Sequence, residues 1–197
     1  MAQNLARREN LADAGLRVLA ALGARGLTHR AVDREAGVPL GTTANYFNSR
    51  DALLGALGGR IFERLAPAPE VFQNVGTAPP TLKLAMTYIQ DIVARTTRHP
   101  ELTLALFELR LEAARRPELA QLMTATLERN FALDTQFYLQ ARLPGGAREV
   151  TLLHYAIDGL LLDLLTVSIN GRRDTDEMVQ ELVHRILGTA EADQPAS

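Results

Sequence analysis

The chain has 197 residues, of which 47% are hydrophobic and 22% charged, a balance typical of a soluble globular protein with a substantial core. It contains no cysteine, which excludes a disulfide framework and thiolate metal sites and leads us to expect a reducing, cytoplasmic compartment. The net charge of −2 is uneven, because residues 1–50 hold seven Arg against four acidic residues and so carry +3, leaving −5 for the remainder. A basic end on an acidic body predicts that the first fifty residues contact a polyanion.

Helices are predicted almost throughout, from apolar spacing and from the caps and breaks between segments. Prolines and glycines between about 66 and 81 predict a loop, and no segment alternates with period two. The predicted helices are one that ends near Gly23, short ones from Thr28 to Gly37 and at 41–48, and longer ones at about 49–66, 81–98, 101–115, 117–142, 147–169 and 175–188. The fold class is therefore all-α, with about nine helices.

The segment Glu149–Ile169 is apolar enough to raise the question of a membrane span. It contains His154, Asp158 and Asp163, each of which is costly in lipid. A buried helix is the better interpretation, and the N-terminal MAQNLARREN lacks the apolar segment of a signal peptide. We expect no membrane association.

Residues 28–47 have the form of a helix, a tight turn at Gly37 and a second helix. In DNA-binding versions of this motif the second helix enters the major groove and the first lies across the backbone. We expect Val38 and Phe47 to anchor the second helix. The side chains expected to face outward, toward bases and phosphates, are Thr42, Thr43, Asn45 and Tyr46.

Flanking phosphates are the expected partners of a second group of residues. Thr28, His29 and Arg30 stand at the start of the first helix of the motif, where backbone N–H groups favour anions. Arg50 stands at the start of the following helix and carries a permanent charge. The alternative interpretation of residues 28–50 is a solvated turn between two packing helices.

The run LTHRAVDREAGVPLGTTANYFNSRDALL, residues 27–54, resembles the DNA-binding domain of the TetR/AcrR family of bacterial transcriptional regulators. The shared features are a Thr that opens the second helix, an Ala-Gly-Val turn, a Gly before the recognition helix and an aromatic-Phe pair. The family often has Tyr where this chain has Ala44, and His where it has Tyr46, so a usual phosphate contact is missing or moved.

The resemblance implies a head at residues 1–48 and a ligand-binding and dimerisation domain at 49–197, connected by the helix at about 49–66. It further implies a homodimer that binds a near-palindromic operator in double-stranded DNA. The expected function is repression, relieved when an unknown small molecule binds among the fifth to seventh helices. A ligand-independent architectural protein or an activator of the same fold is the alternative.

The effector pocket is predicted among helices whose apolar positions exceed one narrow stripe, although each candidate is also a plausible core residue. An inward Arg110 would favour an acidic or carbonyl-bearing ligand. The candidates are Tyr88, Phe107, Arg110, Met123, Phe131, Phe137 and His154.

The dimer interface is predicted on the helices at 149–169 and 175–188. The first is apolar on nearly all sides, and one protomer covers only part of such a helix. A four-helix bundle with the symmetry mates would cover the rest, and the family resemblance implies the same interface. The predicted interface residues are Leu153, Ile157, Leu161, Leu164, Met178, Leu182 and Ile186.

An enzyme is disfavoured. His154 and Asp158 are four residues apart and share a helix face, as a metal or acid–base pair would. No zinc-protease motif, nucleophile elbow or phosphate loop accompanies them. We therefore expect no catalytic residues, no metal and no cofactor.

Overall fold

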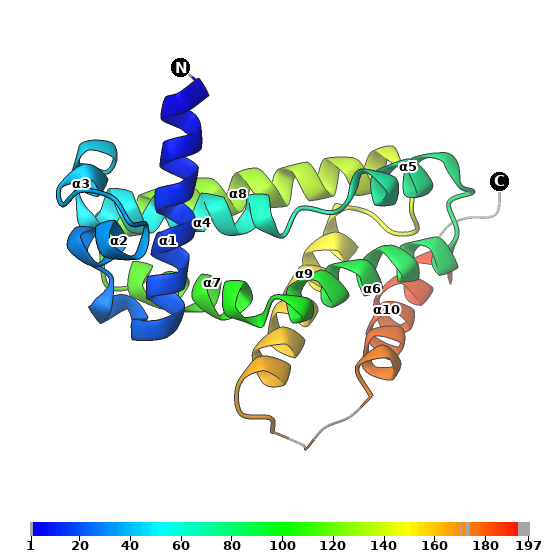
Figure 1. Ribbon diagram of the computed structural model, residues 1–197. Coiled ribbons are helices and arrows are strands. Elements are labelled where there is room, and N and C mark those ends of the chain that lie inside the picture. Colours follow the sequence, from blue (N-terminus) through cyan, green and yellow to red (C-terminus); the bar gives the residue numbers. More distant parts are fainter. Residues whose placement is uncertain (1, 170, 172–173, 193–197) are drawn as a thin grey trace. The chain divides into compact units, whose positions relative to one another are not determined.

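The computed structural model describes residues 2–169, 171 and 174–192. Within these ranges every regular element is a helix, which confirms the all-α prediction (Figure 1). The described helices are α1 (Ala2–Gly26), α2 (His29–Glu35), α3 (Thr42–Tyr46), α4 (Arg50–Arg64), α5 (Pro69–Thr77), α6 (Leu82–Arg98), α7 (Pro100–Ala113), α8 (Pro117–Gln140), α9 (Ala147–Leu165) and α10 (Thr175–Ala192).

Helix α5 lies where the sequence predicted a loop, so the described residues hold ten helices rather than about nine. Pro69 is its first residue, a place that suits proline because the first N–H groups of a helix have no partner within it. Glu70 follows in the first turn, where the helix dipole favours negative charge. The prolines of this segment therefore bound a helix rather than exclude one.

The helices group into two compact units by their contacts. The first unit comprises Met1–Ala66 and His99–Asn130, and the second comprises Pro67–Arg98 and Phe131–Ser197. This grouping follows a different boundary from the functional division at 48/49, because α4, α7 and the first part of α8 pack with the N-terminal helices. The functional division itself stays a prediction.

The core of the first unit is built where α1, α2, α4 and α7 meet. Ser49 caps α4 by accepting a hydrogen bond from the N–H of Ala52 at 3.0 Å, which starts the helix where the sequence predicts it. Phe47 anchors the end of α3 in this core, as predicted, with 1% of its surface exposed. The core also contains Leu11, Leu19, Leu27, Val32, Leu53, Leu54, Leu57, Ile61, Leu109 and Leu119.

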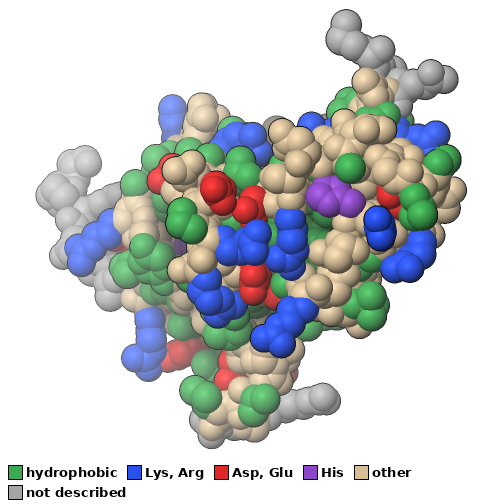
Figure 2. Space-filling model, turned by 90° about the vertical axis from the view of Figure 1, so that its left-hand side faces the viewer, with side chains coloured by type: hydrophobic (Ala, Val, Ile, Leu, Met, Phe, Trp, Pro, Cys, Tyr) green, Lys and Arg blue, Asp and Glu red, His purple; other side chains and the backbone are tan. Residues whose placement is uncertain are grey.

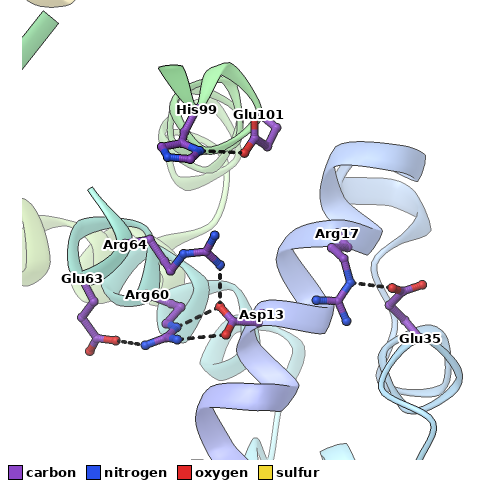
Figure 3. Close-up of polar contacts among 8 residues, drawn as sticks. All are labelled: Asp13, Arg17, Glu35, Arg60, Glu63, Arg64, His99 and Glu101. Atoms are coloured by element: carbon purple, nitrogen blue, oxygen red, sulfur yellow. Dashed lines mark hydrogen bonds and ion pairs between the residues drawn. The ribbon is translucent and has the colours of Figure 1, made fainter. Parts of the chain in front are cut away.

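An ion-pair cluster ties α1 to α4 within the first unit (Figure 3). Asp13 on α1 accepts two hydrogen bonds from Arg60, both at 2.9 Å, and one from Arg64 at 3.2 Å. The hydrogen bond from Arg60 contributes most to holding the pKa of Asp13 below its usual value. One turn further along α1, Arg17 pairs with Glu35 of α2 at 2.6 Å. Both neighbours of α1 are thereby fixed in register with it.

In the second unit, α10 packs against α6 and α9. Tyr138, at the end of α8, is 2% exposed, and its hydroxyl donates a hydrogen bond of 2.7 Å to the carbonyl of Pro144. The other buried residues of this unit include Ala85, Tyr88, Ile89, Val93, Leu153, Ile157, Leu161, Val179, Val183 and Leu187. None of the described helices is both long enough and apolar enough to cross a bilayer.

Candidate functional sites

The turn between α2 and α3 is made possible by two glycines. Gly37 has φ +64° and Gly41 has φ +92°, values that favour glycine over any residue with a Cβ. Thr28 precedes α2 and accepts a hydrogen bond from the N–H of Ala31 at 3.1 Å. The helix–turn–helix form predicted for residues 28–47 is thus present.

Asp33 fixes α3 to α2. Its carboxylate accepts hydrogen bonds from the N–H of Gly41 at 2.7 Å, the N–H of Thr43 at 2.7 Å and the hydroxyl of Thr43 at 2.5 Å. Burial opposes ionisation of Asp33, but the bonds from Thr43 and Gly41 outweigh it and hold its pKa below the usual value. Asp33 is not among the predicted site residues, although an acidic residue between Val32 and the turn is a signal that the sequence contains.

Thr43 does not face outward as predicted. Its side chain is 0% exposed, because its hydroxyl is committed to Asp33. Tyr46 is half-buried and packs against the core of the first unit. Thr42 is partly accessible and donates a hydrogen bond of 2.6 Å to the carbonyl of Pro39. Asn45 is exposed, so it is the predicted base-reading residue that remains available.

Of the residues predicted to contact phosphates, some are exposed and others are engaged within the protein. Thr28 and Arg30 are exposed. His29 is half-buried, and its Nε2 donates a hydrogen bond of 2.7 Å to the carbonyl of Phe47, so it supports the end of α3. Of the residues predicted to contact phosphates at the start of α2, Arg30 is therefore the exposed one with a permanent charge.

Arg50 supports the junction between α1 and α2 instead of pointing away from the protein. Its guanidinium donates to the carbonyls of Ala24 and Leu27. These carbonyls lie at and just beyond the end of α1 at Gly26, where no further helical turn supplies N–H groups to them, and α1 is also interrupted at Gly23, which has φ +66°. The N–H of Ala24 is bound by Glu108 of α7 at 2.5 Å. Two of its five N–H donors are engaged in this way, so Arg50 supports the fold, and its contact with a phosphate stays a prediction.

Exposed arginines surround the helix–turn–helix motif. Figure 2 faces the side of the structure that carries α2 and α3, and shows Lys and Arg side chains across it with a smaller number of acidic ones. Arg8 is exposed, and its guanidinium lies 5.1 Å from the centre of the Phe47 ring. The other exposed arginines of the first 34 residues are Arg7, Arg17, Arg25, Arg30 and Arg34.

The structure brings several of the predicted pocket residues together in the second unit. The rings of Tyr88 and Phe137 are 5.5 Å apart, and Phe137 makes an edge-to-face contact of 4.9 Å with Phe72 of α5. Phe131 contacts His154 at 5.2 Å. Sequence reasoning missed Phe72 because it assigned this segment to a loop.

Asp134 also joins this aromatic group, and no predicted set includes it. It accepts a long hydrogen bond of 3.5 Å from the hydroxyl of Tyr88. Burial raises the pKa of Tyr88, and the nearby charge of Asp134 adds to the effect. Desolvation likewise raises the pKa of Asp134, against the opposing influence of Arg95, His154 and Tyr88.

The remaining pocket candidates lie in the first unit. Met123 is 1% exposed and packs so closely on Gly58 that a Cβ there would lie 2.6 Å from its sulfur, so it is core. Phe107 is half-buried, with the guanidinium of Arg110 6.0 Å from its ring. Arg110 is exposed, which corrects the inward orientation that favoured an acidic ligand.

Phe131 lines a depression of about 610 Å³ together with Thr135 and Leu139. All of its lining residues belong to α8, and it opens to solvent. His154 is exposed, and its Nε2 lies 3.8 Å from Asp158, too far for a hydrogen bond. The described residues contain no group of three or more His, Asp or Glu side chains placed to hold a metal.

The predicted dimer residues of α9 are mostly covered within one chain. Leu153, Ile157 and Leu161 are 2%, 6% and 4% exposed, because this face of α9 packs inside the second unit. They are therefore not free to form an interface, and that part of the prediction is wrong. The others, Leu164, Met178, Leu182 and Ile186, are half-buried. The opposite face of α9 carries exposed apolar side chains, at Leu152, Tyr155 and Leu162.

More than half of the chain, residues 80–189, matches the family described as "Tetracyclin repressor-like, C-terminal domain". The chain belongs to the TetR family. The fold of this TetR-family protein is that of a DNA-binding transcriptional regulator with a ligand-binding domain, and its relatives are regulators rather than enzymes. No curated protein sequence matches it.

Solved structures of the TetR family resemble the whole chain. The multidrug binding protein EbrR complexed with ethidium has a TM-score of 0.68 and 26% identity, over 92% of this chain and 98% of EbrR. The fatty acid degradation regulator FadR from Bacillus halodurans has a TM-score of 0.71 and 16% identity, over 92% and 94%. A TetR-family regulator from Rhodococcus sp. has a TM-score of 0.70 and 20% identity, over 98% of both chains. The last two likenesses concern the fold alone.

Replacing Asp33 with Asn should lower the free energy of unfolding by about 1–3 kcal/mol, because the new amide group faces the N–H of Gly41. Denaturant titration measures this loss, with Asp176→Asn on the exposed start of α10 as a control that should change little. The depressed pKa of Asp33 means that its contribution is present above pH 3.8, the ordinary Asp value, and disappears as the pH falls through the lower native value. The difference between wild type and variant should therefore shrink in acid. Equal stability at pH 7 would contradict the assigned role.

Proposed function

We propose that the chain is a cytoplasmic bacterial repressor that binds a near-palindromic operator as a homodimer and is released by a small molecule. The observation that carries this proposal is the position of α3. Its N-terminus is held on α2 by Asp33, and Asn45 faces outward from it. Phe47 holds the other end of α3 in the core, and a short helix fixed at both ends and open along one face suits entry into the major groove.

The chemistry of the exposed residues supports reading of DNA. Asn45 carries an amide that can pair with both hydrogen-bonding positions of adenine in the major groove. Thr42 adds a methyl group and a hydroxyl beside it. Arg30 and Arg34 are exposed on α2 and would contact phosphates on either side. Base contacts and phosphate contacts thus come from neighbouring helices of one motif.

The exposed face of α9 supports a homodimer. Leu152, Tyr155 and Leu162 are 43%, 68% and 49% exposed, and their spacing places them along one side of the helix. A Cβ at Gly159, between them, would meet no atom, so a second helix can approach closely there. A second copy of the chain, contributing the same face and the half-buried residues of α10, would cover these side chains.

Release by a small molecule is supported by the relationship to EbrR, whose structures hold ethidium and proflavin. In this chain the corresponding proposal is an effector bound by residues of the second unit. Such an effector weakens DNA binding only if it prefers the conformation of the dimer that fits the operator less well.

The variants Asn45→Ala and Arg30→Ala should separate base reading from phosphate binding. Asn45→Ala should cost about 1–3 kcal/mol on a selected operator and little on a scrambled duplex. Arg30→Ala should weaken binding to both and reduce the salt slope by about one. Arg50→Ala is the matched comparison: it should lower stability by removing the bonds to Ala24 and Leu27, and its salt slope shows whether the remaining N–H groups of Arg50 also contact a phosphate. Titrations at two salt concentrations measure all three, and unchanged operator binding by both Asn45→Ala and Arg30→Ala would refute this reading surface.

The substitutions Leu162→Glu and Leu161→Glu should have opposite consequences although the residues are neighbours. Leu162 is 49% exposed, so a charge there should give a folded monomer by disrupting the proposed interface. Leu161 is 4% exposed, so a charge there should unfold the second unit. Sedimentation velocity at micromolar concentration and circular dichroism measure the two effects. A wild-type monomer under these conditions would contradict the proposed dimer.

A further inference from the structure

Asp134 and three aromatic rings form one group in the second unit. Asp134 and Phe137 are three residues apart on α8 and so share a face of it. The hydroxyl of Tyr88, from α6, lies 3.5 Å from the carboxylate of Asp134. The ring of Phe72, from α5, lies 4.9 Å from that of Phe137. We call Phe72, Tyr88, Asp134 and Phe137 the aromatic–carboxylate site.

The members of this site differ in their accessibility. Tyr88 is 3% exposed and is the most deeply buried of the three rings, whereas Phe72 is 40% exposed and Phe137 is half-buried. Asp134 is reachable by solvent, yet the surrounding protein atoms remove enough of its hydration to raise its pKa. A carboxylate that a ligand can reach but that is poorly hydrated is stabilised in its charged form by a positive charge placed beside it.

Carboxylates outnumber arginines around Asp134. Arg95 of α6 acts on Asp134 and also forms an ion pair of 2.7 Å with Asp91, so its single positive charge faces two carboxylates. From α9, His154 lies beside Asp158 at 3.8 Å. The carboxylate of Asp134 therefore leaves this surface negative, and an anionic ligand would be repelled by it.

We propose that the aromatic–carboxylate site binds an organic cation with a planar apolar body. The positive charge lies beside the carboxylate of Asp134, and the body packs on the rings of Phe72 and Phe137. Aromatic faces attract cations through their quadrupole, so the rings and the carboxylate favour the same charge. This inference rests on the proposed function, because it names the chemical class of the effector.

The neutral alternative is disfavoured by the same contacts. A neutral planar molecule would gain the packing on Phe72 and Phe137, but it would displace water from Asp134 without replacing the lost hydration. The difference between a cation and a neutral molecule of the same shape therefore isolates the contribution of the carboxylate.

Calorimetric titration of the full-length protein without DNA tests the proposal, using N-methylquinolinium as the cation and quinoline, at a pH where it is uncharged, as the neutral match. We expect the wild type to bind the cation at least about tenfold more tightly. Asp134→Asn should remove most of this preference and leave the affinity for quinoline unchanged. Phe137→Leu should weaken both probes, and Asp176→Asn on exposed α10 should weaken neither.

Equal binding of the two probes by the wild type would overturn the proposal, as would an undiminished cation preference in Asp134→Asn. The wild-type comparison decides the question even if Asp134→Asn does not fold, because it requires no variant. Since DNA is absent, the result does not depend on whether the helix–turn–helix motif binds an operator. Failure of the proposed function would be seen separately, in the DNA titrations of Asn45→Ala and Arg30→Ala.

Discussion

The carboxylate of Asp33 accepts three hydrogen bonds from the residues that begin α3, and the arrangement of the helix–turn–helix motif depends on it. Helix α3 has only five residues, too few to hold its own shape or direction without tertiary support. Asp33 supplies that support at one end, and Phe47, buried in the core, supplies it at the other. With both ends fixed, the outward face of α3 has a defined orientation, which a DNA-reading surface requires.

The junction between α1 and α2 also depends on hydrogen bonds from side chains to backbone groups. The backbone of Ala24 is held from both sides, its N–H by Glu108 of α7 and its carbonyl by Arg50 of α4. The break at Gly23 leaves the N–H without its helical partner, the end of α1 at Gly26 does the same for the carbonyl, and side chains of the longer helices satisfy both. Charged residues near the motif therefore serve two purposes. Arg50 supports the fold, whereas Arg30 and Arg34 remain exposed for a partner.

Much of the fold is predictable from the sequence because caps and breaks are local signals. Thr28 and Ser49 start helices by hydrogen bonds within three residues, so their effect is readable without the rest of the chain.

Other features depend on contacts between distant residues. The orientation of Thr43 depends on a buried carboxylate ten residues away, and that of Leu161 depends on which side of an apolar helix the neighbouring helices cover. The periodicity of apolar residues indicates that α9 is buried on many sides. It does not show whether helices of the same chain or of a second chain bury it. The site around Asp134 depends on contacts among α5, α6 and α8, so spacing along one helix gives no sign of it.

The central claim is that α3, held by Asp33 and carried in a symmetric dimer, reads DNA. Selection of bound duplexes from a random pool by the purified protein tests it most directly. The account predicts enrichment of a near-palindrome whose half-sites lie about one helical turn, or a multiple of it, apart. Recovery of no enriched sequence, or of a single asymmetric half-site, would contradict it.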